Sequence, residues 1–504
     1  MNIWSDISPD QLINIAIILP LIGAALVILL GKHPNIRETA SLAIATLLFT
    51  VVMSITENTF AEIPMTSHWI TIIPNLSIAF NVEPLGVLFA LVASFLWIIT
   101  TIYAIGYMRG HNEKNQTRFF CCFALAIATV MAICFSANLL TLFIFYELLT
   151  LSTYPLVTHA GNDAAKRGGR IYLGILLGTS IAFLLFAVLA TWVSAGTLTF
   201  TSGGIFNESQ SKGLIALLLV LFCYGVGKAA IMPFHRWLPA AMVAPTPVSA
   251  LLHAVAVVKA GVFSILKIII YIFGIDNLSQ IATTDFMLYI GAATVLLSSC
   301  VAITKDNLKA RLAYSTVSQL SYIVVGALLA SSVAAAGASL HIATHAVGKI
   351  TLFFCAGAIM VAAHKKSVSE LVGLGRQMPI TMIAFAIGSM SIIGLPPLAG
   401  TWSKWYLVVG ALESDKLIIV AVLMVSTLLN VAYLLPIPIK AFFNPSDSQQ
   451  PAWSWSEVNE APFAIFLALC VTSVACLALF FFPQPLIDLI NLIPDVSTHV
   501  TGGS

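Results

Sequence analysis

Long apolar runs and short polar stretches alternate along the whole chain. A helix needs about 20 apolar residues to cross a bilayer, and fourteen runs approach or exceed this length. They predict membrane-spanning helices at 11–31, 38–56, 84–107, 118–135, 138–158, 171–196, 213–234, 248–273, 285–304, 312–330, 337–363, 379–411, 417–443 and 462–485. The pattern therefore predicts an all-α polytopic membrane protein with about 14 transmembrane helices.

Two of these segments contain residues that break helices. The segment 379–411 is long for one crossing and contains the sequence GLPPLAG at 394–400, and the segment 213–234 contains Pro233 shortly after Lys228. Proline removes a backbone donor and collides with the preceding turn. We therefore expect a broken helix in both segments, which a membrane protein tolerates where the backbone faces protein or water.

The composition agrees with this class of protein. Of the 504 residues, 59% are hydrophobic and 9% are charged, and the mean hydropathy is +0.98, whereas soluble proteins carry about 25% charged residues. The net charge of +2, with no basic stripe, gives no indication of nucleic-acid binding. The first apolar run follows Asp6 and Asp10 and no basic residue, so we expect a retained helix and no cleaved leader.

The expected loops carry unequal positive charge. If the N-terminus lies outside, 16 of the 23 Lys and Arg fall in cytoplasmic loops, and the outside receives only Lys212, Lys267 and Lys416. The cytoplasmic set is Lys32, Arg37, Arg109, Lys114, Arg118, Lys166, Arg167, Arg170, Arg236, Lys305, Lys309, Arg311, Lys365, Lys366, Arg376 and Lys440. Because such an excess marks the cytoplasmic side, we expect a multi-pass protein of the inner (plasma) membrane with both termini on the non-cytoplasmic side.

The two broken segments stand five helices apart and each carries one lysine, Lys228 or Lys404. Helices 4–8 and 9–13 are then two inverted five-helix units, an arrangement typical of transporters with their ion site at the breaks. A chance distribution of prolines is the alternative. The repeat predicts four parts: helices 1–3 in 1–115, the first unit in 116–275, the second unit in 285–443, and a loop with helix 14 in 444–504.

Ionisable side chains occupy seven positions of the apolar segments. They are Glu147, Lys228, Lys259, His341, His345, Lys349 and Lys404. A charge near the bilayer centre costs about 2.5–3.5 kcal/mol, so membrane segments retain such residues mainly for function. The string predicts an ion or proton path that faces protein or water.

Glu147 and Lys228 are the candidate acid and base of a proton switch. Burial disfavours the charged form of each group, and a nearby opposite charge restores it. A change in the distance between them would therefore change how tightly each holds a proton. The alternative is a static buried ion pair that joins two helices.

The other bases extend this path. Lys259 lies on the eighth segment together with His253, which is on another face and is either part of the path or a satisfied helix contact. His341, His345 and Lys349 are spaced by four residues and so share one stripe of a helix. Such a stripe suits proton relay; a metal site would need a third ligand that the neighbouring sequence does not supply.

The roles of two further sets of residues stay open. Ser315, Ser318, Gln319 and Ser321 on the tenth segment could hold water beside the histidine stripe or only aid helix packing. Lys404 follows the second break and is either the terminal proton site of the second unit or a lysine that snorkels to a membrane edge, where Trp402 and Trp405 would belong to an interfacial belt.

Motifs for nucleotide or electron chemistry are missing. The chain has no P-loop, no Gly-rich dinucleotide fingerprint, and no cysteine framework for iron–sulfur or haem among its eight scattered cysteines. We expect no cofactor and no metal. The expectation is a secondary transporter subunit that is not an enzyme and takes its energy from an ion gradient or from a partner.

Five segments resemble the antiporter-like, proton-translocating subunit family shared by respiratory complex I, membrane-bound hydrogenases and Mrp-type cation/proton antiporters. They are FYELLTLSTYPLV, VGKAAIMPFHRWLPAAMVAPTPVSALLHAVAVVKAGVF, DNLKARLAYSTVSQLSYI, SLHIATHAVGKITLFF and GLPPLAGTWSKW. The resemblance covers nearly the whole chain and is densest from 118 to 443. It implies a hydrated axis of the matching glutamate and lysines, two half-channels of inverted symmetry, and partner membrane subunits.

Within this family the chain looks most similar to the D-type member of Mrp antiporters, because of NVAYLLPIPIKAFF and Lys404, where the complex I subunit of similar length usually has glutamate. The segment LTLSTYPLVTH departs from common D-type sequences, so a relative that serves another machine stays open. The first hypothesis is a subunit of a multi-subunit Na⁺/H⁺ antiporter, with H⁺ and Na⁺ as its ions. The alternative is a proton-pumping subunit of a respiratory NADH:quinone oxidoreductase or related redox complex, and the third is a membrane scaffold that conducts no ion.

Overall fold

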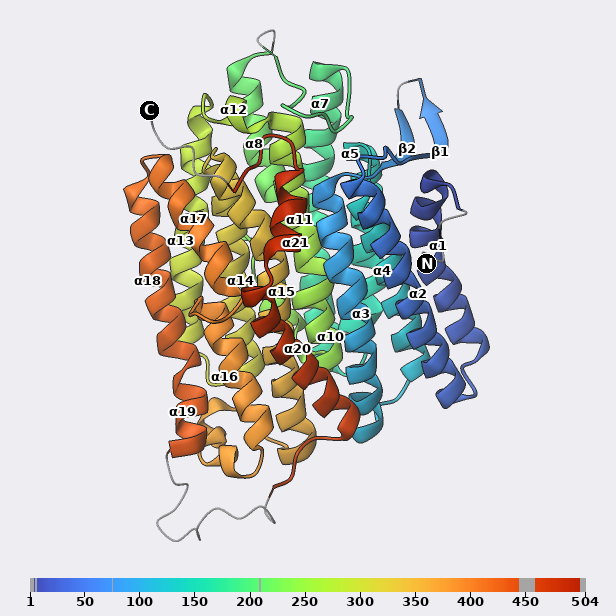
Figure 1. The fold of residues 1–504 in the computed structure, drawn as a ribbon, viewed down its shortest axis with the longest axis vertical. Helices are drawn as coiled ribbons and strands as arrows, with labels where there is room; N and C mark the ends of the chain where they lie inside the picture. The colour runs from blue at the N-terminus through green and yellow to red at the C-terminus, as the bar shows by residue number, and fades with distance from the viewer. Residues whose placement is uncertain (1–3, 5–6, 75, 208–209, 444–457, 499–504) are drawn as a thin grey trace.

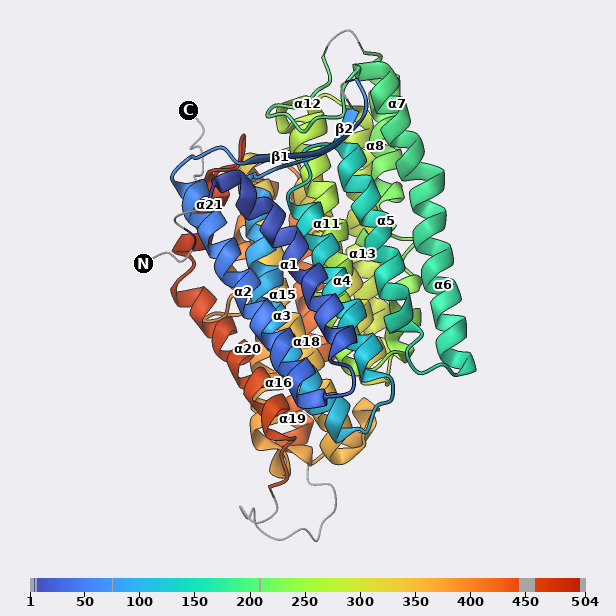
Figure 2. The ribbon, with the colours of Figure 1, turned by 90° about the vertical axis from the view of Figure 1, so that its right-hand side faces the viewer.

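Long, roughly parallel helices form a bundle, as two perpendicular views show (Figures 1 and 2). The computed structural model describes the chain except residues 1–3, 5–6, 75, 208–209, 444–457 and 499–504. The elements up to residue 195 are α1 (Pro9–Leu29), α2 (Pro34–Phe60), β1 (Thr66–Ile73), β2 (Leu76–Asn81), α3 (Pro84–Gly110), α4 (Gln116–Cys134), α5 (Leu139–Val157), α6 (Asp163–Thr179), a π-helical turn (Ser180–Leu185) and α7 (Phe186–Ala195).

The remaining elements include several short or irregular helices. Up to residue 278 they are α8 (Lys212–Gly225), a 3₁₀ turn (Gly227–Ala229), α9 (Trp237–Ala240), a 3₁₀ turn (Ala241–Val243), α10 (Thr246–Ala250), a π-helical turn (Leu251–Val255), α11 (Val257–Ile268), a π-helical turn (Ile269–Phe273) and α12 (Ile275–Leu278). They continue with α13 (Ala282–Thr304), α14 (Leu308–Leu328), α15 (Ser332–Ala363), 3₁₀ turns (Val368–Leu371, Leu374–Arg376), α16 (Pro379–Ile393), α17 (Gly400–Glu413), α18 (Leu417–Leu434), α19 (Pro436–Phe443), α20 (Phe463–Phe481) and α21 (Gln484–Asn491).

The predicted helical membrane architecture is confirmed. Eleven helices among the described residues are long and apolar enough to cross a membrane. The other three expected segments coincide with the shorter α8, with the more polar α14, and with the pair α16 and α17. Part of the loop expected in 444–504 lies outside the described residues, at 444–457.

Polar caps and prolines set where the helices begin. The side chains of Asn138, Asn162, Asn307 and Ser331 accept hydrogen bonds from backbone N–H groups three residues on, at the starts of α5, α6, α14 and α15. Proline occupies the first helical position of α1, α2, α3 and α16, where its missing N–H costs nothing. The caps and prolines therefore mark the starts of helices that are apolar along most of their length.

Both predicted breaks occur, but the first lies earlier than expected. The α-helical part of its segment ends at Gly225, so Lys228 lies within the break and not before it. Gly225 and Gly227 explain the position, because a Cβ on either would meet Leu184 N at 2.5 Å or Thr179 Oγ1 at 2.2 Å. In the second break, α16 ends at Ile393, and the next residue, Gly394, forms a left-handed cap with a φ of 89°, which glycine adopts without strain.

A two-stranded antiparallel hairpin is the part of the fold that the apolar pattern did not predict. Strand β1 pairs with β2 and lies beside the adjoining ends of α1 and α5 (Figure 2). Trp69 of β1 donates from its indole to Asn14 Oδ1 at 2.7 Å, and its ring meets the Phe80 ring at 4.8 Å. The hairpin lies at the end of the bundle that also holds α7 and α12.

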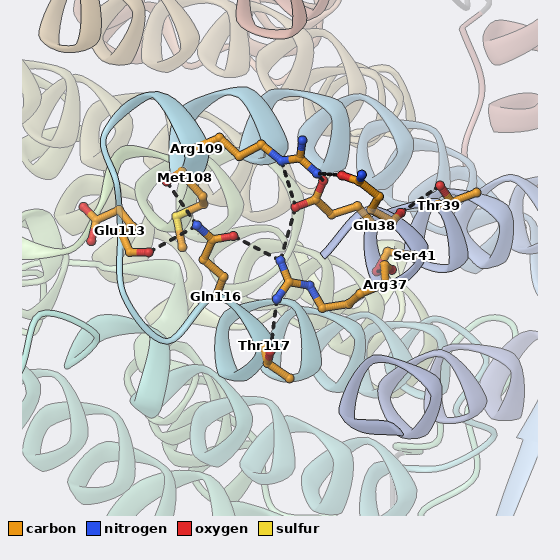
Figure 3. Close-up of polar contacts among 10 residues, drawn as sticks. Arg37, Glu38, Thr39, Ser41, Met108, Arg109, Glu113, Gln116 and Thr117 are labelled. Carbon is orange, nitrogen blue, oxygen red and sulfur yellow. Dashed lines mark hydrogen bonds and ion pairs between the residues drawn. The ribbon is translucent and has the colours of Figure 1, made fainter. Parts of the chain in front are cut away.

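The opposite end, called the basic end below, carries the loops that hold most of the Lys and Arg. Figure 3 shows Arg37 and Glu38 of α2 pointing toward Arg109 of α3 and toward Gln116 and Thr117 of α4. Arg37 donates to Thr117 Oγ1 and to Gln116 Oε1, both at 3.0 Å, while Arg109 forms an ion pair with Glu38. Arg37 and Glu38 are buried, so this network fixes three helices at the basic end.

Candidate proton path

The amine of Lys228 is held in the first break by polar atoms of α5. Its Nζ donates to the Tyr146 carbonyl oxygen at 2.7 Å and to Thr150 Oγ1 at 2.6 Å, and its backbone N–H donates to the Tyr146 hydroxyl at 3.0 Å. Gly261 of α11 packs against the same backbone, since a Cβ there would lie 2.4 Å from the Lys228 carbonyl carbon. Lys228 is fully buried, so its proton can leave only through protein or internal water.

Glu147 interacts electrostatically with Lys228 but does not form an ion pair with it in the described part of the chain. Both carboxylate oxygens are buried without a hydrogen-bond partner, although the Ser180 hydroxyl lies close by. The two groups are therefore near enough to influence each other but are not in contact. A static buried ion pair does not describe this geometry.

Lys259 and His345 form the central contact. Lys259 Nζ lies 2.6 Å from His345 Nδ1, and both side chains are buried. One nitrogen must donate and the other must accept, so the two groups cannot both be fully protonated. A proton can therefore pass between α11 and α15 at this point.

His341 extends the contact toward the second break. Its ring stacks against that of His345 with centroids 5.6 Å apart, and its Nδ1 lies 2.9 Å from Ser403 Oγ. Ser403 precedes Lys404 on α17. The shared stripe predicted for the two histidines is thus present, and it links the central pair to the second break.

Lys349 is held by hydroxyl groups. Its Nζ donates to Ser315 Oγ at 2.6 Å, and the Tyr433 hydroxyl donates to the same oxygen at 2.8 Å. Of the other tenth-segment residues, Ser318 instead bonds with Ser299 at 2.9 Å, and Ser321 donates back to the carbonyl oxygen of Val317. Only Ser315 therefore touches the predicted path directly.

Lys404 points into the protein and not to a membrane edge. It is 8% exposed, and its Nζ donates at 3.0 Å to the carbonyl oxygen of Ile393, in the last turn of α16. The amine also lies 4.8 Å from the centre of the Tyr322 ring. Gln319, one turn before Tyr322 on α14, is buried, and its two amide atoms have no hydrogen-bond partner among the described residues, which leaves polar atoms between Ser315 and Tyr322 for water.

The charges along this path are unbalanced. Glu147 is its one acid, and the fully buried acids of the described residues, Glu38 and Glu83, make their contacts elsewhere. Five further bases follow from Lys259 to Lys404, and their printed partners are hydroxyl groups, carbonyl oxygens and, for Lys259 and His345, each other. Buried like charges repel strongly, so this stretch can hold few protons at once.

One lysine was placed wrongly by the sequence pattern. Lys267 was expected in an outside loop, but α11 continues past it, and the side chain is fully buried. Its Nζ forms an ion pair with Glu83 at 3.0 Å and donates to the Ser136 carbonyl oxygen at 2.7 Å. The predicted segment 248–273 already included Lys267, so its assignment to a loop disagreed with the predicted helix.

Cavities lie at both ends of the bundle. The cavity at the basic end has a volume of about 420 Å³ and is lined by residues that include Tyr107, Glu113, Thr246 and Lys309. The cavity at the opposite end has a volume of about 470 Å³, and Glu413 and Lys416 line it. In the described ranges, no group of three or more His, Cys, Asp or Glu is arranged to hold a metal ion.

Residues 136–430 match the family model described as "NADH:quinone oxidoreductase/Mrp antiporter, TM", and residues 69–120 match "NADH-Ubiquinone oxidoreductase (complex I), chain 5 N-terminus". The chain is 34% identical to NADH-quinone oxidoreductase subunit N of Desulforudis audaxviator over 366 residues, 71% of this chain and 72% of that protein. It is 33% identical to NAD(P)H-quinone oxidoreductase subunit 5 of Paulinella chromatophora over 369 residues, 68% of this chain but only 53% of the relative.

Two solved structures share the fold. A chain in the membrane-bound sulfane sulfur reductase, an archaeal respiratory membrane complex, superposes with a TM-score of 0.84 at 20% identity, covering 96% of this chain and 98% of that one. A chain in the Mrp complex from Dietzia sp. DQ12-45-1b gives a TM-score of 0.78 at 22% identity, covering 95% and 98%.

These names correct one expectation. The chain was expected to be a secondary transporter subunit and not an enzyme, and this is contradicted because its relatives are named as subunits of oxidoreductases. The sequence motifs could not reveal this, because the redox groups of such an enzyme need not be bound by the membrane chain itself.

Proposed function

Because the chain belongs to the NADH:quinone oxidoreductase/Mrp antiporter family, we propose that it is the proton-translocating membrane subunit of a respiratory quinone oxidoreductase or a related redox complex. The line of buried bases from Lys228 to Lys404, with Glu147 at one end, is the observation that carries the proposal. The identity with subunits N and 5 of quinone oxidoreductases supports the redox-driven host. Other membrane subunits and redox subunits are then its partners.

We further propose that Glu147, Lys228, Lys259, His345, His341, Lys349 and Lys404 conduct the protons. Moving Glu147 toward Lys228 would favour the charged amine, and moving it away would release that proton toward Lys259 and His345. The unwound turn that carries Lys228 and the end of α16 beside Lys404 are the places where the two inverted units, 116–275 and 285–443, would change shape. No cofactor is needed within this chain for such a step.

The orientation is part of the same proposal. With the basic end in the cytoplasm, the excess of Lys and Arg lies on the side that the positive-inside rule requires. The subunit then belongs in the inner (plasma) membrane, and protons enter from the cytoplasmic side. Exchange for Na⁺ remains the second candidate function, favoured by Lys404 at the second break.

The test uses the complex that assembles around this chain in its own membrane. Tagging the chain and isolating its partners should yield flavin and iron–sulfur subunits. In inside-out vesicles, Lys228→Ala should lower redox-driven proton pumping by about 100-fold or more, because a positioned proton carrier contributes at least that much. Full pumping by Lys228→Ala, at normal assembly, would overturn the path; proton uptake that requires Na⁺ and no electron donor would establish the second candidate instead.

A further inference from the structure

The helix predicted for the apolar run 171–196 contains an irregular turn. The π-helical turn Ser180–Leu185 joins α6 to α7 and adds one residue to the winding of an otherwise continuous helix. The turn has the sequence SIAFLL, so no proline causes the irregularity. A single π-helical turn within an α-helix frequently marks a functional site.

The π-helical turn packs against the first break. A Cβ on Gly225, the last residue of α8, would collide with the backbone of Leu184, and a Cβ on Gly227 would collide with the hydroxyl of Thr179, which directly precedes the turn. Lys228 follows Gly227. Because a closely packed interior transmits displacements, a movement of the backbone around Lys228 also moves the π-helical turn.

Ser180, the first residue of the turn, lies beside Glu147. The serine side chain is fully buried, and its hydroxyl is near enough to the carboxylate to interact with it. In the structure the hydroxyl donates instead to the Leu177 carbonyl oxygen at 3.1 Å. That carbonyl oxygen also accepts from the Ser180 backbone N–H, so it keeps a partner when the hydroxyl turns away. The hydroxyl therefore has two possible acceptors and can leave the first without orphaning it.

The other polar neighbours of Glu147 are occupied. The titratable groups near its carboxylate are Lys228, Tyr146 and Tyr172. The amine of Lys228 donates to α5, the Tyr146 hydroxyl accepts from the Lys228 backbone N–H, and the Tyr172 hydroxyl bonds with a threonine hydroxyl at 2.7 Å. Among these neighbours, the serine of the π-helical turn is the donor that can turn to the carboxylate at the least cost.

The extra residue of the turn lets one helix contact both members of the proposed switch. Ser180 at the start of the turn lies beside the acid, and Leu184 near its end lies against the break that carries the lysine. Removing one residue from the turn would rotate its end relative to its start by about 100°. A regular α-helix could therefore not hold both contacts at once.

We propose that Ser180 is a positioning residue, which holds Glu147 as a carboxylate when this acid is withdrawn from Lys228. The hydroxyl then turns from the Leu177 carbonyl oxygen and donates a hydrogen bond to the carboxylate; no covalent bond changes, and the serine keeps its proton. A buried carboxylate without a donor is costly, and a hydrogen bond favours its charged form. Glu147 then does not capture the proton that Lys228 releases, and this proton moves on toward Lys259. The inference rests on the proposed function and adds a residue to it.

The first experiment follows the protonation of Glu147. The reagent N,N′-dicyclohexylcarbodiimide reacts with neutral carboxyl groups in apolar sites, and its addition to the peptide that contains Glu147 is measured by mass in the assembled complex. We expect Ser180→Ala to react about tenfold faster than the parent chain, because one hydrogen bond to a charged group is lost. Equal rates in Ser180→Ala and the parent would overturn the proposal.

Two variants control this measurement. Ser194 of α7 makes the same kind of bond, from its hydroxyl to the Thr191 carbonyl oxygen at 3.3 Å. Ser194→Ala should therefore react at the parent rate, and acceleration equal to that of Ser180→Ala would overturn the proposal. Glu147→Gln removes the reacting group and gives the blank.

The second experiment measures redox-driven proton pumping at normal assembly. Ser180→Ala should lower pumping several-fold, and Ser194→Ala should leave it unchanged. Ser180→Thr keeps the hydroxyl and should restore most of the loss; pumping as low as in Ser180→Ala would overturn the role of the hydroxyl. If Ser180→Ala pumps normally while Lys228→Ala in matched membranes does not, the role of Ser180 is wrong and the proposed function stands. If both pump normally, the proposed function itself fails.

Discussion

Two buried lysines of the first half of the molecule, Lys228 and Lys267, have acids near them, whereas two buried lysines of the second half, Lys349 and Lys404, are held by neutral groups. Lys228 interacts with Glu147, and Lys267 is paired with Glu83. Lys349 and Lys404 are held by the Ser315 hydroxyl and the Ile393 carbonyl oxygen. In the proposed path, moving an acid would control the proton on Lys228, whereas repulsion between neighbouring bases would control the protons on Lys349 and Lys404.

Adding an acid to the second half should abolish this difference and have the largest effect. In Ser315→Asp, a carboxylate about 4 Å from Lys349 would attract its charge with about 4 kcal/mol at an effective dielectric of about 20. Lys349 would then hold its proton about a thousandfold more tightly. We expect redox-driven proton pumping to fall to background in vesicles.

Ser315→Asn is the matched control for that variant, because it has nearly the same size and no charge. It should retain most of the pumping. Equal losses in the two variants would show that the site responds to volume and not to charge, and the contrast between the halves would lose its basis.

Removing an acid pair from the first half should affect stability next most strongly. Glu83→Gln leaves the buried Lys267 charge unpaired, and breaking such a pair costs about 3–5 kcal/mol. The thermal midpoint of the purified complex, measured by loss of native assembly, should fall clearly. The double variant Glu83→Gln with Lys267→Met should regain most of this loss; a double variant no more stable than the single one would contradict the role of the pair.

His159, at the basic end of the first half, should have a smaller, pH-dependent effect on stability. Burial, reinforced by Arg118, lowers the pKa of His159, which lies in the loop between α5 and α6, and Glu113 opposes the shift. The folded state then binds fewer protons than the unfolded state below about pH 6.5, so stability falls as the pH drops through this range. His159→Gln should reduce the loss of thermal midpoint between about pH 7.5 and about pH 5.5; an unchanged pH dependence would exclude His159 as its source.

Breaking the ion pair at the cavity opposite the basic end should give the smallest effect. Lys416 and Asp285 form an exposed ion pair with a distance of 2.7 Å. Surface pairs contribute about 0.2–1 kcal/mol, so Lys416→Gln should change the free energy of unfolding by no more than this. Proton pumping should stay normal, and a large loss of pumping would show that the cavity opposite the basic end has a role in conduction.

Apolar patterning predicted most of the fold because each membrane helix is a long run that little else imitates. The apolar pattern did not predict the hairpin or the start of the break at Lys228. The hairpin at 66–81 is short, lies outside the apolar runs, and is fixed by contacts such as that between Trp69 and Asn14. The break at Lys228 begins at Gly225 because of the close approach of Leu184, a residue remote in sequence.

The candidate path was predictable as a set of residues and not as a set of contacts. Lysines and histidines are conspicuous in apolar runs because polar residues are rare there. A spacing of four places His341 and His345 on one face of a helix. No spacing within one helix could predict that Lys259 meets His345, since the pair joins α11 and α15. Glu83 was missed because it directly precedes α3, where an acid is normally exposed, and only the fold places it beside Lys267.

Tyr146 and Glu147 are consecutive residues of α5, and they hold opposite relations to Lys228. Tyr146 accepts a hydrogen bond from the amine with its carbonyl oxygen, and the carboxylate of Glu147 lies nearby without a hydrogen-bond partner among the described residues. Because both contacts come from one helix, a rotation of α5 would change both of them at once. A rotation of α5 driven by an adjoining subunit would then change the free energy of protonation of Lys228 Nζ.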